Sequence, residues 1–351
     1  MSILELDNLV LTYPNMKVPA VDHISLKLEH REIHALVGES GCGKSSTIRT
    51  IAGLEIPAKG EIRYRDRMLN KPGWAVAPEE RQIGMVFQDY ALFPHLTVKE
   101  NILFGVQNKS ERTAERMNHY LELTGLEGLG ERYPQEISGG QMQRVALARA
   151  LAPEPELILM DEPFNNLDIR IKRNMLEEVG TILRKTGTSC LFITHEKDEA
   201  FILADRISVM RSGRLLQTAP PDELYHHPVD TYVAEFFGRA NHIPVKKEGD
   251  VYRSPMGDVA CASLFPRTGV RPDEGYLVHR PWNVKIGENE RVEVEVLDSF
   301  FFGDYQEVRF RTVEGERENS YKFFTRIDRQ FCKGDTLRIS LPLGELTFCR
   351  N

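Results

Sequence analysis

The hydrophobic pattern of the chain begins with a period of two. Residues 3–13 and 21–28 alternate apolar with polar side chains, and Pro14 and Asn15 separate the two runs. This period is typical of strands and Pro-Asn of a turn, so we expect two strands here. Short apolar runs follow, which indicates strands buried on both faces. They cover residues 33–37, 83–87, 157–160 and 190–194.

Segments with a helical period lie between these apolar runs. They cover residues 45–54, 97–107, 111–123, 145–151, 172–184 and 196–204. Two of them, within residues 97–123, interrupt a β-rich region, so we expect a helical insert in an α/β core. Residues 206–218 have the pattern of a hairpin that turns at Ser212 and Gly213.

The pattern changes again from about residue 241 onwards. Val292, Val294 and Val296 alternate with charged residues, and similar short runs follow them. Such runs indicate an all-β domain. We expect the aromatic run at residues 300–302 to lie in the core or in a subunit interface.

The composition is that of a water-soluble globular protein. The chain has 351 residues, enough for two domains, and is 41% hydrophobic and 28% charged. Its net charge of −7, from 45 basic and 52 acidic residues, argues against binding nucleic acid in bulk. We expect no membrane span and no secretory signal. The scattered cysteines suggest a reducing compartment: Cys42, Cys190, Cys261, Cys332 and Cys349.

One glycine-rich stretch predicts a phosphate site. Glycines let successive backbone N–H groups converge on an anion, and the helix that follows directs its positive end at the same place. Lys44 adds a charge that can reach the terminal phosphates, and the Ser45 hydroxyl can hold Mg²⁺. The stretch follows an apolar run and reads Gly38, Glu39, Ser40, Gly41, Cys42, Gly43, Lys44 and Ser45.

A second anion-binding helix end is expected at Ser138, Gly139 and Gly140, which precede a strong helix-forming segment. One phosphate group rarely needs two such ends within a chain. The economical explanation is that this second end closes on a nucleotide held by another subunit.

Polar side chains end two of the apolar runs. Asp161 and Glu162 follow residues 157–160, at the strand end where α/β sheets place their chemistry. Asp161 can hold Mg²⁺ through water, and Glu162 can orient or deprotonate an attacking water. His195 ends the run at 190–194 and is well placed to hydrogen-bond a γ-phosphate, although a lone histidine is most often structural.

Tyr13 is open to two interpretations. An aromatic ring one hairpin before a phosphate loop could stack on adenine. The alternative is a half-buried tyrosine of the first strand, and its position alone favours that alternative. The pair His226 and His227 precedes Pro228 and is interpreted as a helix terminus rather than as a metal site.

Residues 3–238 closely resemble the ATP-binding subunit of ABC transporters. Seven motifs occur in the family's order: Tyr13 at the adenine-stacking position, Walker A at 38–45, Gln88 of the Q-loop, the signature at 138–141, Walker B at 157–162, the D-loop at 165–168 and the switch histidine His195. Two residues depart from the family pattern. Ile137 replaces a usual leucine, and Asn165 stands where serine or alanine is common.

The resemblance implies a fold and a set of roles. It implies a P-loop cassette at 1–238, with a mixed β core and a helical subdomain at about 89–155, followed by an OB-like β domain at 239–351. Glu162 would be the general base, His195 would bind the γ-phosphate, and Gln88 would contact Mg²⁺ or the water. ATP would contact Tyr13, residues 38–45, Ser46, Ser138, Gly139, Gly140, Gln141 and Asp168. Mg²⁺ would contact Ser45, Gln88 and Asp161.

The resemblance also implies partners. Two cassettes pair head to tail in this family, so a homodimer is expected. Residues around 89–96, together with the helical insert, would grip membrane permease subunits at the cytoplasmic face of the inner membrane. A periplasmic or lipid-anchored substrate-binding protein would take part indirectly.

The last domain resembles that of importer ATPases for maltose, polyamines, sulfate, molybdate and ferric iron. The segment 238–241 favours ferric iron, with a polyamine close behind. Two other kinds of protein also use a phosphate loop: a soluble ABC ATPase acting on nucleic acid, and a small-molecule kinase. The first usually has two cassettes or a coiled-coil insert, and the second has no use for residues 138–141.

Overall fold

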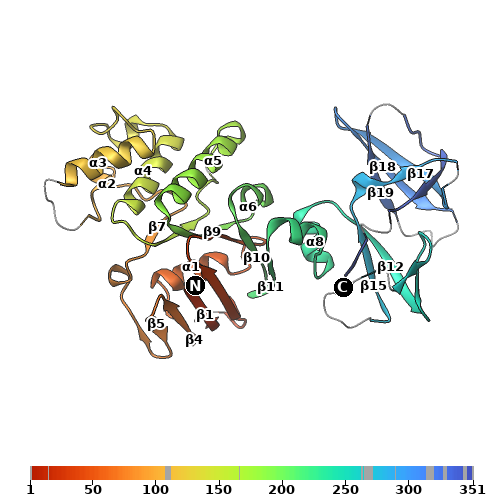
Figure 1. Ribbon diagram of the computed structural model, residues 1–351, viewed down its shortest axis with the longest axis horizontal. Coiled ribbons are helices and arrows are strands. Elements are labelled where there is room, and N and C mark those ends of the chain that lie inside the picture. The colour runs from red at the N-terminus through yellow and green to blue at the C-terminus, as the bar shows by residue number, and fades with distance from the viewer. Residues whose placement is uncertain are drawn as a thin grey trace. The chain divides into compact units, whose positions relative to one another are not determined.

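The computed structural model describes most of the chain. The described residues are 2–14, 16–106, 112–165, 167–261, 264, 272–288, 290–313, 320–326, 330–342 and 346–349. They form two compact units, Met1–Pro221 (unit 1) and Asp222–Asn351 (unit 2). Figure 1 labels the elements of both units along the chain.

Unit 1 contains two sheets. The first is antiparallel where its pairing is described, in the order β2-β1-β4-β5-β6. Its strands are β1 (Ser2–Leu11), β2 (Val21–Glu29), β4 (Lys59–Tyr64), β5 (Arg67–Lys71) and β6 (Trp74–Ala75). The pair of strands that the alternating pattern predicted at 3–13 and 21–28 is therefore confirmed.

The second sheet of unit 1 has the order β11-β10-β3-β9-β8-β7. Its neighbours pair in parallel, except that β10 and β11 form an antiparallel hairpin. The strands are β3 (Ile33–Val37), β7 (Gly84–Val86), β8 (Leu157–Asp161), β9 (Ser189–Thr194), β10 (Arg206–Arg211) and β11 (Arg214–Ala219). Every residue of β3, β8 and β9 is buried, as the uninterrupted apolar runs predicted.

Helix α1 (Lys44–Ala52) lies in the core that joins the two sheets. Its Ile48 and Ile51 are fully buried in one apolar cluster with Leu6 of the first sheet and Leu159 of the second. Gly53 ends the helix in a left-handed conformation with φ of 87°. The phosphate loop is therefore followed by a helix that is held on both sides.

The helical insert contains short helices. They are α2 (Val98–Ile102), α3 (Arg112–Leu123), η2 (Pro134–Glu136) and α4 (Gly139–Leu151), whereas the short helix η1 (Pro78–Glu80) lies before β7, outside the insert. The helix predicted at 97–107 is wrong in length, because the chain leaves α2 in tighter turns: Phe104 N–H donates to Asn101 O, and Val106 N–H donates to Leu103 O. Residues 107–111 of the two predicted helices lie outside the described residues.

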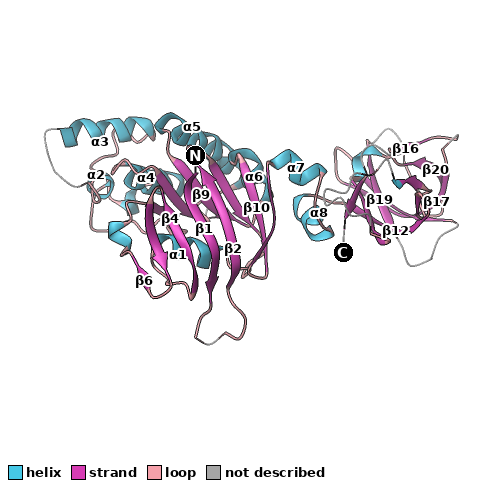
Figure 2. Ribbon diagram, turned by 60° about the horizontal axis from the view of Figure 1, so that its bottom comes forward, coloured by secondary structure: helices cyan, strands magenta, loops and turns pink. Residues whose placement is uncertain are grey.

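The remaining helices of unit 1 are α5 (Ile169–Thr186) and α6 (Lys197–Leu203). Figure 2 shows α3, α5 and α6 along one side of the strands. Across the described residues, no helix is both long and apolar enough to cross a membrane.

Helix α7 (Pro221–His226) begins at the last residue of unit 1, α8 (Thr231–Phe237) follows it, and the described remainder of unit 2 consists mainly of strands and turns. His226 ends α7, as predicted. The guanidinium of Arg280 donates to the carbonyl oxygens of Tyr225, Ala234 and Gly238 at 2.8–2.9 Å, which ties both helices to the β domain.

Two antiparallel sheets make up the β domain. One has the order β14-β13-β12-β15-β21, with β12 (Asn241–Glu248), β13 (Val251–Arg253), β14 (Val259–Ala260), β15 (Glu274–His279) and β21 (Thr347–Cys349). The other has the order β16-β20-β17-β18-β19, with β16 (Lys285–Ile286), β17 (Val292–Phe301), β18 (Gln306–Thr312), β19 (Tyr321–Thr325) and β20 (Thr336–Ser340). The short helix η4 (Pro281–Asn283) precedes β16.

Both sheets contribute to one apolar core, which includes Val294, Val296 and Phe310. The all-β prediction is therefore confirmed. The prediction that residues 300–302 lie in the core is wrong, because Phe300, Phe301 and Phe302 are 40%, 66% and 49% exposed. The alternating pattern ends before these residues, where β17 runs beyond the core; the alternative of a subunit interface stays a prediction.

Candidate functional site

The loop between β3 and α1 has a backbone that only glycine allows at two positions. A Cβ on Gly38 would lie 2.2 Å from the Met210 carbonyl oxygen, and one on Gly43 would lie 2.0 Å from that of Ala20. Gly43, with φ of 110°, also begins α1 as its N-cap residue. The loop is thus fixed against β10 and the end of the first hairpin, with the N-terminus of α1 facing the loop.

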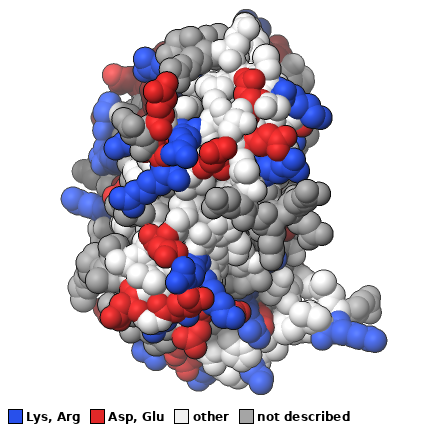
Figure 3. Space-filling view, turned by 90° about the vertical axis from the view of Figure 1, so that its right-hand side faces the viewer, with Lys and Arg blue, Asp and Glu red and all other residues white. Residues whose placement is uncertain are grey.

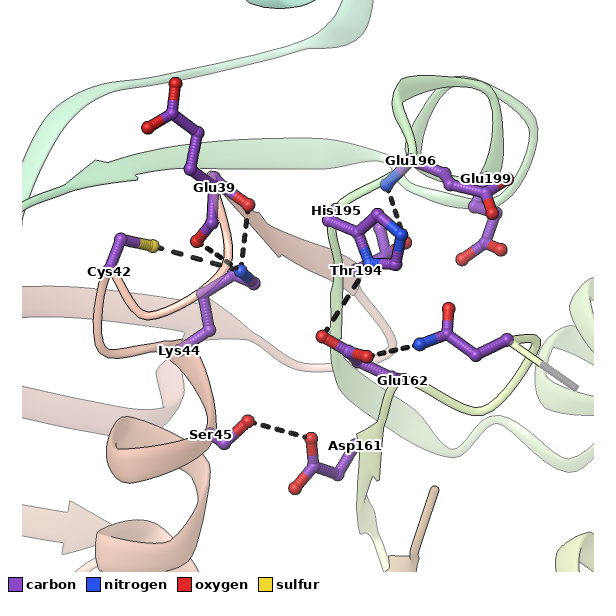
Figure 4. Close-up of polar contacts among 12 residues, drawn as sticks. Glu39, Cys42, Lys44, Ser45, Asp161, Glu162, Thr194, His195, Glu196 and Glu199 are labelled. Atoms are coloured by element: carbon purple, nitrogen blue, oxygen red, sulfur yellow. Dashed lines mark hydrogen bonds and ion pairs between the residues drawn. The ribbon is translucent and has the colours of Figure 1, made fainter. Parts of the chain in front are cut away.

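Lys44 folds back onto the loop that precedes it. Its ammonium donates hydrogen bonds to the carbonyl oxygens of Gly38 at 2.8 Å and Glu39 at 3.0 Å, and the side chain is 4% exposed (Figure 4). The charge is therefore held at the loop, within reach of an anion that the loop would enclose.

Ser45 and Asp161 face one another across the site. The Ser45 hydroxyl donates to Asp161 Oδ1 at 3.1 Å, from the first turn of α1 to the end of β8 (Figure 4). Burial raises the pKa of the Asp161 carboxyl, against the hydrogen bond from Ser45 that lowers it. A hydroxyl and a buried carboxylate are oxygen ligands of the kind Mg²⁺ takes, and a cation here would offset the desolvation of the carboxylate.

Glu162 follows Asp161 in a left-handed backbone conformation, with φ of 45°. Its N–H donates to Ile193 O at 3.2 Å, which anchors the residue to β9. His195 Nδ1 lies 3.7 Å from Glu162 Oε1, and the amide of Asn165 donates to Oε2 (Figure 4 shows the contact with His195). The structure therefore brings together two side chains that the sequence singled out separately.

A pocket of about 410 Å³ opens beside the loop. Its polar wall includes Lys44, Ser45 and Glu162, and its more apolar wall includes Tyr13 and Met16. The other lining residues are Val18, Pro19, Ala20, Ser40, Gly41, Gly43, Ser46, Ser212 and Gly213. The Tyr13 hydroxyl donates to Ser46 Oγ at 3.2 Å. A polar end beside the loop and an apolar side near Tyr13 suit a phosphorylated ligand with a flat ring.

Other predicted site residues do not line this pocket. Gln88 is exposed in the turn after β7, and Asp168 is exposed just before α5. Ser138 caps α4 by accepting from Gln141 N–H at 3.3 Å, while the Gln141 amide oxygen accepts from Ser138 N–H at 2.9 Å. The capped end of α4 therefore lies outside the pocket of its own chain.

The comparisons with known proteins agree with this geometry. The family of ABC transporter domains matches residues 21–165, which include the loop and Glu162. An Fe(3+) ions import ATP-binding protein, FbpC 1 of Rhizobium meliloti, is 35% identical over 302 residues, 84% of each chain.

The chain belongs to the ATP-binding subunits of ABC importers.

Two further relatives of this importer family carry other names. The putrescine transport ATP-binding protein PotG of Escherichia coli is 43% identical over 335 residues, 90% of this chain and 85% of that protein. A sulfate/thiosulfate import ATP-binding protein, CysA 2 of Chromobacterium violaceum, is 44% identical over 66% of this chain, and the match spans 62% of that protein's length.

A solved structure supports the cassette fold of this importer subunit. It is the dimeric post-hydrolysis state of the ATP-binding cassette MJ0796 bound to ADP and Pi, with a TM-score of 0.55 and 28% identity. The match covers 62% of this chain and 98% of that cassette. The predicted P-loop ABC ATPase fold is confirmed, and ATP hydrolysis is the activity of the family.

The sequence does not predict two contacts near the ATPase site. Asn165 belongs to the predicted D-loop and departs there from the family pattern, but the contact of its amide with Glu162 is not predicted. Arg149, on α4, donates to the carbonyl oxygens of Tyr90 and Ala91 in the turn that follows Gln88. No sequence motif predicts either contact, because each depends on how a loop packs against another part of the folded chain.

Proposed function

We propose that two copies of this chain form a head-to-tail dimer that hydrolyses ATP to drive uptake through membrane permease subunits. The observation that carries the proposal is that Glu162 lines the same pocket as Lys44 and Ser45, with its carboxylate beside His195. A base, a phosphate loop and a histidine that can bind phosphate are the groups that phosphoryl transfer to water needs.

The positions of the side chains support the following roles. The loop N–H groups and the Lys44 ammonium bind the β- and γ-phosphates after the ammonium leaves the loop carbonyls. Glu162 accepts a proton from water as the water oxygen bonds to the γ-phosphorus. The bond between that phosphorus and the bridging oxygen breaks, which releases ADP and inorganic phosphate. His195 holds the γ-phosphate by a hydrogen bond.

Ser45 and Asp161 would hold Mg²⁺, with Gln88 as a further predicted contact. The ion neutralises charge on the phosphate oxygens when it is bound. The hydrogen bond between Ser45 and Asp161 places both oxygen ligands on one side of the pocket. The adenine ring would stack on Tyr13, whose side chain also lines the pocket.

The second half of the site would come from the partner cassette. The signature residues 138–141 cap α4 and do not line the pocket of their own chain, so pairing would bring the N-terminus of α4 to the partner's ATP. The relative MJ0796 was solved as a dimer bound to ADP and Pi, in agreement with this arrangement.

The permease contact would lie on the helical insert, as the family resemblance implies. Phe104 is 61% exposed and packs against Phe93, with the ring centroids 4.2 Å apart and the ring planes tilted by 35°. Asn101 is fully buried and holds this loop through hydrogen bonds to the backbone of Phe93, Leu96 and Thr97. An apolar, preformed surface of this kind suits a helix of a permease at the inner face of the membrane.

The transported substrate is proposed to be ferric iron, on the resemblance at residues 238–241. A polyamine is the second candidate, because PotG is more similar over a longer stretch than the iron-transport relative, at 43% against 35% identity. Uptake of radiolabelled iron and putrescine by vesicles carrying the assembled importer separates the two. Sulfate or sugar uptake would overturn both.

A nucleic-acid ATPase is the alternative from a different class. On the face drawn in Figure 3, lysine and arginine side chains are interspersed with acidic ones. A nucleic-acid backbone is bound by clustered basic side chains, and this mixture of charges on the drawn face does not favour such binding. Co-purification with permease subunits supports the importer, whereas co-purification with ribosomes or DNA would overturn it.

Replacing Glu162 by Gln tests the assignment of the base. We expect the E162Q protein to bind ATP and to accumulate as a dimer, while steady-state turnover is lost. E177Q, on the exposed face of α5, is the matched control and should turn over ATP at the normal rate. Normal turnover by E162Q would show that another group activates the water.

A further inference from the structure

Asn165 lies in the turn that follows β8, three residues after Glu162. Its backbone N–H points back to the carbonyl oxygen of Glu162 at 3.4 Å, and its side-chain amide donates to Glu162 Oε2. Phe164, between them, is fully buried, and its carbonyl oxygen accepts from Leu167 N–H at 3.3 Å. The turn is thus fixed by its own hydrogen bonds and by one buried ring.

The orientation of the amide follows from chemistry. A carboxylate accepts hydrogen bonds, so the nitrogen of the Asn165 amide has to face Glu162. The other end of the amide, Oδ1, is buried and has no hydrogen-bond partner within the described parts of the chain. The contact with Glu162 is therefore what fixes this side chain, and the bond to a charged group is the strong kind.

We propose that Asn165 is a positioning residue for the general base, an inference that rests on the proposed function of Glu162. The amide occupies Oε2 and leaves Oε1, on the side of His195, to receive the proton from water. It also stabilises the carboxylate in its ionised form, which is the form that accepts a proton. A serine or alanine at this position is too short to make the same contact.

Steady-state kinetics of the assembled importer tests this role with two substitutions. N165A removes the donor, and we expect kcat to fall about tenfold while KM for ATP changes by less than about twofold. N165D keeps the shape of the side chain but places a second carboxylate against Glu162, so its kcat should be lower still. N174A, an exposed asparagine on α5, is the matched control.

The outcomes separate this inference from the proposed function. Normal kcat in N165A, or a rise in KM that accounts for the whole loss, overturns the role of Asn165. An N165D protein as active as N165A overturns the electrostatic part of the argument. Thermal melting of each variant detects a general loss of folding, which would count against the role. If E162Q itself turns over ATP normally, the function proposed for Glu162 fails, whatever Asn165 does.

Discussion

The Arg149 guanidinium donates a hydrogen bond of 2.8 Å to the carbonyl oxygen of Tyr90. A second bond goes to the carbonyl oxygen of Ala91, and the guanidinium lies 5.6 Å from the centre of the Phe93 ring. Tyr90 and Ala91 both have positive φ, 62° and 46°, which is unfavourable for residues other than glycine. One side chain of the signature helix α4 thus stabilises a strained turn just after Gln88.

The first prediction concerns this turn. R149A should lower the stimulation of ATP turnover by the permease about fivefold or more, because the turn relaxes and no longer links α4 to the Q-loop. ATP binding by the isolated subunit should stay normal. Adding A91G should restore part of the stimulation, since glycine accepts positive φ without strain. Full stimulation in R149A would show that the turn holds its shape without the arginine.

The second prediction compares two glycines of the phosphate loop. G43A should unfold more easily by about 2–3 kcal/mol and bind ATP weakly, because the new methyl group would lie 2.0 Å from Ala20 O. G41A also has positive φ, 82°, but no atom lies within 4 Å of its Cβ position, so a loss of only about 1 kcal/mol is expected. Thermal melting and nucleotide titration measure both; equal losses would contradict the steric argument.

A third prediction concerns Arg81, which is 1% exposed and has no carboxylate partner among the contacts described. It donates to the carbonyl oxygens of Thr50 and Ile51, at the C-terminal end of α1, and to that of Val76, which follows β6, at 2.7–3.0 Å. Burial lowers its pKa to about 10, so it stays charged at neutral pH and complements the helix dipole.

Replacing Arg81 by Met should therefore destabilise unit 1 by about 3 kcal/mol, because the buried hydrogen bonds from its guanidinium to three carbonyl oxygens are lost. ATP affinity should fall with it, since α1 carries the phosphate loop. Denaturant unfolding measures the first effect. R63M, at a strand position where the arginine is 56% exposed, should change stability little. An unchanged midpoint for R81M would be incompatible with this role.

The fourth prediction is a pH effect at Glu32. Burial raises its pKa, but hydrogen bonds from His34 at 2.9 Å and from Glu29 N–H outweigh burial and hold the pKa below its usual value. Ionised Glu32 therefore stabilises the fold above the pKa of the unfolded chain, and this contribution is lost as the pH falls through the folded pKa.

We accordingly expect E32Q to be less stable than the natural protein by about 1 kcal/mol at pH 7. The difference should shrink below about pH 4.5. Melting curves of both proteins between pH 3 and pH 7 measure it. A difference that stays constant over this range would mean that the charge of Glu32 makes no contribution.

The sequence predicts the parts of this protein that depend on local pattern. The phosphate loop, the strand that ends at Asp161 and the hairpin at Ser212 and Gly213 all lie where spacing and turn residues place them. Contacts such as that of Asn165 with Glu162 could not be predicted, because they depend on a left-handed turn at Glu162 that no residue type announces.

The length of α2 shows the same limit. Its start at Val98 is encoded by the capping residues Thr97 and Glu100, but its end at Ile102 is set by turns that the apolar period does not reveal. The predicted domain boundary at residue 238 likewise rests on the resemblance alone. The compact units of the structure divide at Pro221 and Asp222, and an independent folding boundary at 238 stays a prediction.

The bonds from Lys44 to its own loop have a consequence for selectivity. An anionic ligand must displace two carbonyl oxygens from the Lys44 ammonium before it can contact the ammonium itself. Binding therefore exchanges one set of hydrogen bonds for another. A small lone anion offers too few replacement contacts to compete well, whereas a triphosphate attached to a stacked base supplies several at once. The resting loop would in this way discriminate against the free phosphate that its own reaction releases.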